Sequence, residues 1–174
     1  MDDFISTVSV PKFHFLNPVA EEIHIFDIAH ALSLTCRFGG HSSVFYSVAE
    51  HSIILASILE SAKAEPLTLL AALLHDAEEA YFPDIPTPIR AQMPEAKAMY
   101  EELRAVILNK FNLWEADWAR VEAVDRRLCI TEAKALGLWN EDWENAGQSL
   151  DVRLHLWSST DAEQLFLNNF QQLQ

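Results

Sequence analysis

The sequence predicts an all-α protein, a helical bundle of five or six main helices around one core. Three observations support this prediction. Helical periodicity dominates the 174 residues, glycine occurs only four times, and half of the residues are hydrophobic, which is enough to build a sizeable core. The chain contains no internal repeat, low-complexity segment or linker, so residues 1–174 are interpreted as a single domain.

The first two helices are expected on either side of a glycine-containing loop. Asp27 can serve as the N-cap of a helix of a few turns at most. The segment RFGGH, residues 37–41, is interpreted as the loop. Ser42 or Ser43 then caps a longer helix that ends near Ala62.

Prolines set the boundaries of the next two helices. Pro66 suits the first turn of a helix that is expected to reach about Phe82. The segment FPDIPTP cannot continue this helix, because proline lacks a backbone donor and drives the preceding residue to extended geometry. Another long helix follows Pro94.

The pattern after this helix predicts one more helix and then a loop. Asn112 and Glu115 resemble a capping box that opens a helix ending near Gly137. Residues 149–157 alternate between polar and apolar side chains like a strand. Since no partner strand is expected, this segment is interpreted as an extended loop.

The chain is expected to finish with a helix over about residues 161–173. Thr160 and Glu163 form a second capping-box pattern in front of it. We expect this helix to pack on a core that contains all the notable motifs, at about residues 22–135.

Composition excludes several classes of partner. The formal net charge of −14 argues against nucleic-acid polymers and anionic membranes, which require clustered lysine and arginine. It does not exclude a small phosphate-bearing ligand, because one local arginine or a bound metal can override the overall field. The longest strongly apolar run, LTLLAALL, is too short to span a bilayer. The two cysteines form no disulfide framework, and the acidic start MDDFIS is unlike a signal peptide, so a reducing cytoplasm is the expected location.

Ionisable residues lie on the core-facing stripes of the predicted helices. His51 fills the gap between Val48 and Leu55 on one stripe. Asp125 lies on the stripe of a later helix, and Glu132 follows two turns further on. Each position has an ordinary explanation as well, such as a hydrogen-bonded core histidine or an ion pair with a neighbouring arginine, Arg126 or Arg127.

The third predicted helix ends its apolar run at the dipeptide His75-Asp76. Successive helix positions point about 100° apart, so one metal at the flank of the helix can contact both side chains. Glu79 follows at helical spacing and can join the same cluster, although a surface position is its ordinary interpretation. Glu78 is expected to be solvated.

The coincidence of these residues predicts a metal site. An isolated buried charge costs several kcal/mol even after relaxation, and a divalent cation removes that penalty. Two imidazoles and two carboxylates suit manganese, cobalt, iron, nickel or zinc. We therefore expect one divalent transition metal bound by His51, His75, Asp76 and Asp125.

The same residues lie in a set of longer motifs. These are HIFDIAHALSLTCRFGGH (24–41), SVAEHS (47–52), LLHDAEE (73–79), DIPTPIR (84–90) and VDRRLCITEA (124–133). Together they resemble the HD-domain metal-dependent phosphohydrolases, notably the small stand-alone 5′-deoxynucleotidase-like branch. The resemblance covers roughly Glu22 to Ala135 and implies an HD-type fold with the four metal ligands named above.

The resemblance also implies roles for residues around the metal. Glu79 matches an acid/base or water-positioning group, and Asp84 matches its companion beside the attacking water. Arg37 matches an arginine that contacts phosphate, and Arg90 the second cation, where lysine is common. The loop residues Phe38 and His41 depart from the family pattern and are expected on the substrate side.

The expected function is the release of phosphate from a small nucleotide, a nucleoside or deoxynucleoside 5′-monophosphate, by metal-activated water. Two alternatives remain open. One is hydrolysis of a cyclic or pyrophosphorylated nucleotide, and the other is a non-catalytic regulatory module that binds metal or nucleotide. The resemblance also implies a possible homodimer. Trp139, Trp143 and Trp157 would lie at such an interface or complete the core of the monomer.

Overall fold

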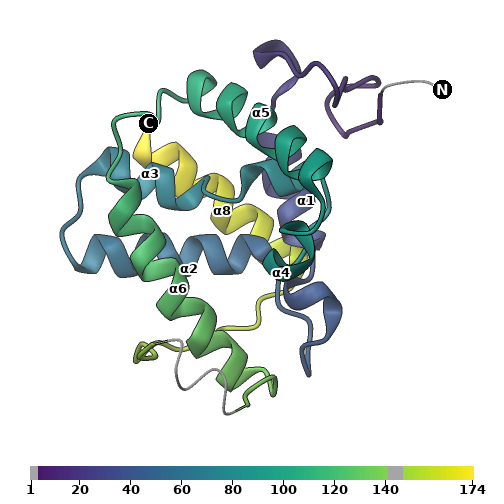
Figure 1. Cartoon of the computed structure of the whole chain (residues 1–174). Helices are drawn as coiled ribbons and strands as arrows, with labels where there is room; N and C mark the ends of the chain where they lie inside the picture. Colours follow the sequence, from purple (N-terminus) through teal and green to yellow (C-terminus); the bar gives the residue numbers. More distant parts are fainter. Residues whose placement is uncertain (1–3, 141–146) are drawn as a thin grey trace.

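Seven α-helices and three short 3-10 helices make up the regular structure of the computed structural model, which describes residues 4–140 and 147–174 (Figure 1). The α-helices are α1 (Ile25–Leu34), α2 (Val48–Ser61), α3 (Pro66–Leu73), α4 (Thr87–Arg90), α5 (Pro94–Lys110), α6 (Trp118–Ala135) and α8 (Ser159–Leu173). The 3-10 helices are η1 (Ala20–Glu22), η2 (Arg37–Gly40) and η3 (Ala77–Ala80). Within the described residues there is no strand, only two isolated bridges. Six α-helices have eight residues or more, which confirms the predicted all-α bundle.

The C-terminal helix α8 lies against the first half of the chain. It contacts α1, α2 and α3, and its Phe166 is fully buried. Helix α6 packs on both α2 and α3, so residues far apart in sequence meet beside α2 (Figure 1). Helix α5 contacts η1, η3 and α4, and covers the chain that follows α3. This packing places α2, the end of α3 and α6 around a common centre.

Helix α2 begins later than the sequence predicted. Its N-cap is Ser47, whose hydroxyl accepts the N–H of Glu50, and not Ser42 or Ser43. The segment just before α2 pairs with the segment just before η2, because Arg37 donates its N–H to Tyr46 and Val48 donates its N–H to Thr35. These backbone bonds fix the loop that carries Arg37 next to the start of α2.

Helix α3 ends much earlier than predicted, at Leu73 rather than near Phe82. The reason is that side chains take the carbonyls that a longer helix would use. The Nδ1 atom of His75 donates to the carbonyl of Ala72 at 2.9 Å, and Nη1 of Arg104 donates to the carbonyl of His75 at 2.7 Å. His75 and Asp76 therefore lie in a turn between α3 and η3, and not on a helix flank.

The N-caps predicted for α1 and α6 are also wrong. Helix α1 starts at Ile25, and Asp27 is buried inside it, where its carboxylate accepts from the hydroxyl of Thr7 and the N–H of Ser9, both at 2.7 Å. Helix α6 is capped by Asp117, which accepts the N–H of Arg120, rather than by Asn112.

The prediction for the last helix is closer to the structure. Ser158 caps α8 by accepting the N–H of Asp161, two residues before the expected cap at Thr160. The end of α6 near Gly137 is confirmed, since Gly137 follows the helix with a φ of +80°.

Residues 149–157 form the predicted extended loop, and a buried carboxylate fastens it to α2. Glu50 is fully buried, and its two oxygens accept the backbone N–H groups of His155, Leu156 and Trp157 at 2.7–2.8 Å. Trp157 packs against the core, as expected for the monomer.

Two other predictions concern surfaces. Trp143 lies outside the described residues, and the homodimer stays a prediction. Among the described residues, no helix combines the length and the apolar character that crossing a membrane requires.

Candidate functional site

Three of the predicted metal ligands meet beside α2. His51 comes from α2, His75 from the turn after α3, and Asp125 from α6. Each offers one ligand atom, and these atoms all lie within 4.8 Å of one another. The Nε2 atom of His51 is 3.2 Å from Nε2 of His75 and 3.0 Å from Oδ1 of Asp125. Both imidazoles are buried, and Asp125 is half-buried.

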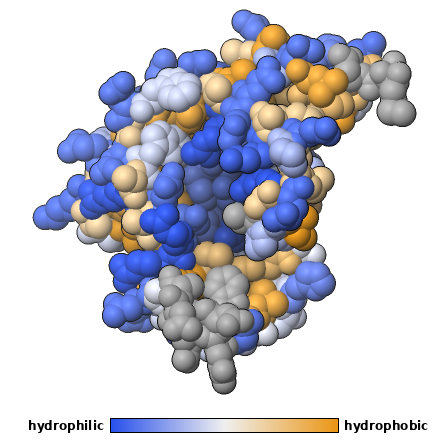
Figure 2. Space-filling model, viewed as in Figure 1, coloured by the Kyte–Doolittle hydropathy of each residue, from blue (hydrophilic) through white to orange (hydrophobic). Residues whose placement is uncertain are grey.

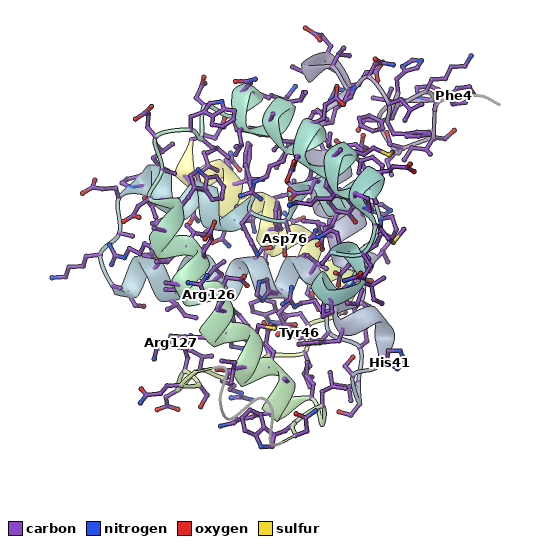
Figure 3. The ribbon with its side chains drawn as sticks, viewed as in Figure 1. Phe4, His41, Tyr46, Asp76, Arg126 and Arg127 are labelled. Atoms are coloured by element: carbon purple, nitrogen blue, oxygen red, sulfur yellow. The ribbon has the colours of Figure 1, made fainter. Side chains whose placement is uncertain are left out.

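The fourth predicted ligand, Asp76, contacts this group at His75. Its Oδ2 atom lies 3.0 Å from Nε2 of His75 and 3.6 Å from Nη1 of Arg37. Figure 3 shows Asp76 in the middle of the bundle, between α4 and α6. Burial alone would raise the pKa of Asp76, but His75, His51 and Arg37 outweigh it and hold this pKa well below its ordinary value.

The other nitrogen of each imidazole has a hydrogen-bond acceptor. Nδ1 of His75 faces the carbonyl of Ala72, which can only accept, so Nδ1 carries the proton. Nδ1 of His51 lies 2.6 Å from Oε1 of Glu132. A neutral imidazole that donates from Nδ1 has a lone pair on Nε2. When both rings are neutral, two lone pairs and the carboxylates of Asp76 and Asp125 are thus directed at one centre.

This arrangement requires positive charge at its centre. Burial and Arg37 lower the pKa of His51, but Glu132 and Asp125 outweigh them and raise it to about 9. The pKa of Asp125 is lowered, because its contacts with His51 and His75 outweigh its burial. A proton or a cation can both supply the charge. Two imidazole nitrogens with two carboxylates form the donor set of a borderline transition metal, so the residues fit such an ion.

Glu132 holds His51 in place, a role that was not assigned from the sequence. It is fully buried, and it accepts from the hydroxyl of Tyr46 at 2.8 Å and from Nε of Arg37 at 3.1 Å in addition to His51. Burial would raise the pKa of Glu132, but Arg37 and His51 outweigh it and lower this pKa. The sequence did contain a signal, because a carboxylate on a core-facing stripe needs a donor. It did not reveal which donor.

A cavity of about 420 Å³ opens beside this centre. Asp76 and Asp125 line it, together with other predicted site residues: Arg37, Phe38, Glu79, Asp84 and Arg90. Figure 2 shows a hydrophilic hollow in the middle of the same face. One predicted substrate residue does not fit, because His41 is exposed, does not line the cavity and projects from the outer end of its loop (Figure 3).

Two carboxylic acids in the cavity have raised pKa values. Glu79 is 8% exposed, and its Oε2 atom has no hydrogen-bond partner among the described residues. Burial, followed by the negative charges of Asp76 and Asp84, raises the pKa of Glu79 to about 10. Burial and Asp76 also raise the pKa of Asp84, against the opposing effect of Arg37. Glu79 is therefore protonated at neutral pH and can donate a proton.

The neighbouring Glu78 was expected to be solvated, and this is wrong. It is only 6% exposed, because α5 covers η3 and brings Arg104 to 3.2 Å from its carboxylate. Burial raises the pKa of Glu78, and the charge of Arg104 opposes the rise. Glu78 therefore faces α5, whereas Glu79 faces the cavity.

Two arginines supply positive charge to the cavity. Arg37 is held through Nε by Glu132, and its guanidinium lies over the ring of Phe38 at 5.4 Å from the centroid. The guanidinium of Arg90 lies 5.0 Å from the ring centroid of Tyr100. Burial would lower the pKa of Arg37, but the negative charges of Glu132 and Asp76 outweigh burial and raise this pKa above its ordinary value. The side chain therefore stays charged.

The ordinary explanation of Asp125, an ion pair with the next residues on its helix, does not hold. Arg126 and Arg127 are exposed and do not line the cavity. Arg126 approaches Glu122 at 4.0 Å, and Arg127 donates to the carbonyl of Gln148. Asp125 instead contacts His51 at 3.0 Å and His75 at 3.9 Å.

Comparison with known proteins places the chain among relatives without an assigned function. No family model matches the sequence. The uncharacterized protein RCAP_rcc00048 of Rhodobacter capsulatus is 35% identical over 109 residues, 59% of this chain and 55% of the relative. The uncharacterized protein YfdR of Escherichia coli is 39% identical over 135 residues, 78% of this chain and 73% of the relative. At this identity and coverage, the chain belongs to the same protein family as Escherichia coli YfdR.

Proposed function

We propose that the protein is a metal-dependent phosphohydrolase of the HD-domain superfamily that releases phosphate from a nucleoside or deoxynucleoside 5′-monophosphate. One observation carries the proposal. The Nε2 atoms of His51 and His75 converge with the carboxylates of Asp76 and Asp125 at the edge of a cavity that also contains an arginine.

The proposed cofactor is one divalent transition metal (Mn, Co, Fe, Ni or Zn) held by His51, His75, Asp76 and Asp125. When bound, such an ion lowers the pKa of a coordinated water and polarises a phosphoryl oxygen. The protein orients both imidazoles in advance, because Glu132 and the carbonyl of Ala72 hold their Nδ1 atoms. Acceptors of this kind fix the tautomer and increase the basicity of the ligand.

Arg37 is proposed to bind the phosphate. Its Nε atom is used by Glu132, and Nη1 lies 3.6 Å from Asp76, so the guanidinium extends along the edge of the metal centre into the cavity. A planar guanidinium can contact a phosphate through two parallel hydrogen bonds, and lysine cannot. Phe38 and Arg90 line the same cavity and are proposed to contact the nucleoside. Its volume of about 420 Å³ is in the usual range for a small ligand.

Glu79 is proposed as the proton donor to the leaving oxygen of the sugar. Its raised pKa keeps the proton on the carboxyl group at neutral pH, and its unpaired Oε2 atom is free to donate. Asp84, on the chain between η3 and α4, is proposed to position the attacking water. Both carboxyl groups line the cavity, and general acid catalysis requires a donor within hydrogen-bond reach of the leaving group.

A pyrophosphorylated nucleotide is a second candidate substrate, because Arg90 places a second guanidinium on the wall of the same cavity. A cyclic nucleotide and a regulatory module without turnover are the remaining alternatives from the sequence. The cytoplasm is the proposed location.

A phosphate-release screen tests the proposal. Metal-depleted protein is reloaded with manganese, cobalt or zinc and incubated with ribonucleotides and deoxynucleotides, including cyclic and pyrophosphorylated ones. We expect release from 5′-monophosphates that is abolished in Asp76→Ala. The exposed Asp151, outside the cavity, provides the control variant Asp151→Ala, which should keep the native rate. Metal binding without release from any nucleotide would support the regulatory module instead.

A further inference from the structure

We propose that Glu132 is a positioning residue that fixes His51 and Arg37 at the same time, so that one buried carboxylate sets both the metal side and the phosphate side of the cavity. This inference rests on the proposed function. Glu132 itself is proposed to bind neither the metal nor the phosphate. Its role is to hold one residue of each binding site in position.

The contacts of Glu132 use both oxygens of its carboxylate. Oε1 accepts from Nδ1 of His51 at 2.6 Å and from the hydroxyl of Tyr46 at 2.8 Å, and Oε2 accepts from Nε of Arg37 at 3.1 Å. These donors come from three places, namely α2, the segment just before it, and η2. Glu132 itself is 0% exposed, so no water competes for these contacts. The position of each donor is therefore defined relative to the other two.

The two sides of the cavity are adjacent to this hub. On one side, the Nε2 atom of His51 lies 3.0 Å from Asp125 in the proposed metal centre. On the other side, Nη1 of Arg37 lies 3.6 Å from Asp76 and its guanidinium lines the cavity. A shift of Glu132 displaces His51 and Arg37 together. The loss of a charged hydrogen-bonding group from a buried network affects every residue in that network.

An amide cannot replace this carboxylate. Glutamine has one oxygen and one NH₂ group, and the three neighbours of Glu132 all donate. If the amide oxygen stays on His51, the NH₂ group faces the Nε–H of Arg37. If the amide is turned round, His51 must accept at Nδ1, which moves its proton to Nε2 and removes the lone pair that faces the metal centre. In either orientation, the loss of negative charge weakens the hydrogen bonds that hold His51 and Arg37 in position.

Glu50 provides a matched control. It is a second fully buried glutamate that accepts three hydrogen bonds, and it precedes His51 directly on α2. Its donors, however, are the backbone N–H groups of residues 155–157, outside the cavity. Glu50→Gln therefore removes a buried carboxylate of equal burial without touching His51 or Arg37. A general loss of stability will appear in both variants, whereas a positioning effect appears only in Glu132→Gln.

The test measures binding of two probes by calorimetry, without turnover. The first is Mn²⁺ alone, and the second is inorganic phosphate added to Mn²⁺-saturated protein. We expect Glu132→Gln to raise the Kd for Mn²⁺ by about 10- to 100-fold, the usual effect of losing the acceptor behind a metal-bound histidine. The Kd for phosphate should rise by roughly 10-fold or more, as for the loss of one hydrogen bond to a charged group. Glu50→Gln should keep both constants within about twofold of the native values.

A double-mutant cycle separates the two sides. In an Arg37→Lys background, which lacks the Nε donor, Glu132→Gln should have little further effect on phosphate binding and should keep its full effect on Mn²⁺ binding. Glu132→Asp keeps the charge but retracts it by one methylene. It should weaken both probes and serves as the second variant if Glu132→Gln does not fold.

The outcomes distinguish this inference from the proposed function. Native protein that binds neither Mn²⁺ nor phosphate overturns both. Native protein that binds both probes, with constants in Glu132→Gln that match those of Glu50→Gln, overturns the role of Glu132 and leaves the proposed function intact. Weakening of one probe alone overturns the dual role.

Discussion

The Nε2 atoms of His51 and His75 lie 3.2 Å apart, and the Nδ1 atom of each ring is held by an acceptor, the carboxylate of Glu132 and the carbonyl of Ala72. Two imidazole lone pairs at this distance repel each other unless positive charge lies between them. The carboxylates of Asp76 and Asp125 reinforce the requirement, since one oxygen of each lies 3.0 Å from one of these Nε2 atoms. A proton on one ring or a bound cation can supply this charge, and the set of donor atoms fits a cation.

Metal binding should stabilise the fold. A ligand present at 100 times its Kd stabilises the folded state by about 2.7 kcal/mol. For a chain of this size, this corresponds to a rise in Tm of roughly 5–10 °C. We expect such a rise when manganese or zinc is added to chelator-treated protein in a thermal melt. His75→Ala should lose the shift, and an equal shift in this variant would place the metal elsewhere.

Replacing Arg37 by lysine should weaken substrate binding although the charge is kept. Lysine cannot hold the Nε contact with Glu132 and also form a two-pronged contact with phosphate. We expect kcat/KM for the preferred nucleotide to fall by about 10- to 100-fold, as for the loss of a hydrogen bond to a charged group. Arg126→Lys is the control, because Arg126 is exposed and does not line the cavity. Equal kinetics for the two variants would exclude Arg37 from the phosphate site.

Glu79 should make the metal-free protein less stable as the pH rises. The folded state keeps the proton on Glu79 up to about pH 10, whereas the unfolded chain releases it near the ordinary value of 4.5. The stability contributed by the protonated group is complete below about pH 4.5 and is lost progressively up to about pH 10. Glutamine stays neutral at every pH. Glu79→Gln should therefore melt higher than the native protein at pH 8–9.

The size of this effect on Tm follows from the size of the pKa shift of Glu79. One unit of pKa shift corresponds to about 1.4 kcal/mol, and about 1 kcal/mol moves Tm of a domain of this size by roughly 2–4 °C. We expect a difference in Tm between Glu79→Gln and native protein that grows from pH 5 to pH 9, measured after chelation. A constant difference over this range would show that Glu79 has an ordinary pKa.

The C-terminal helix should contribute strongly to stability. Phe166 of α8 is fully buried where α8 contacts α1, α2 and α3. Truncating a buried phenylalanine to alanine costs about 3–5 kcal/mol, because the cavity left behind closes only partly. Phe166→Ala should show this loss in urea unfolding. Phe26→Ala should be nearly neutral, because Phe26 is 61% exposed. A small loss in Phe166→Ala would mean that α8 does not complete the core.

The periodicity of the sequence was enough to find the ligands that lie on long helices. His51 and Asp125 interrupt apolar stripes with a period close to 3.6, and both point inward in the structure. The same reasoning placed Glu132 on the stripe of α6 but gave it no partner. Its partners His51, Arg37 and Tyr46 are 81, 95 and 86 residues away in sequence, and periodicity holds no information on such pairs.

The sequence was least informative where side chains compete with the backbone. The segment after Leu73 has a helical pattern, yet α3 ends there because His75 and Arg104 take the carbonyls of Ala72 and His75. The burial of Glu78 likewise depends on Arg104. Both outcomes require α5 to lie over η3, which is a feature of tertiary structure. His41 is expected on the substrate side because this loop departs there from the family pattern, but the loop directs it outward.

The most direct test of this account is a crystal structure of the protein grown with zinc, with data collected at the absorption edge of the metal. We predict one anomalous peak bounded by His51, His75, Asp76 and Asp125, about 2.0–2.2 Å from its ligand atoms. A peak at another position, or a refined centre in which these side chains face one another without any metal at millimolar zinc, would contradict the central claim.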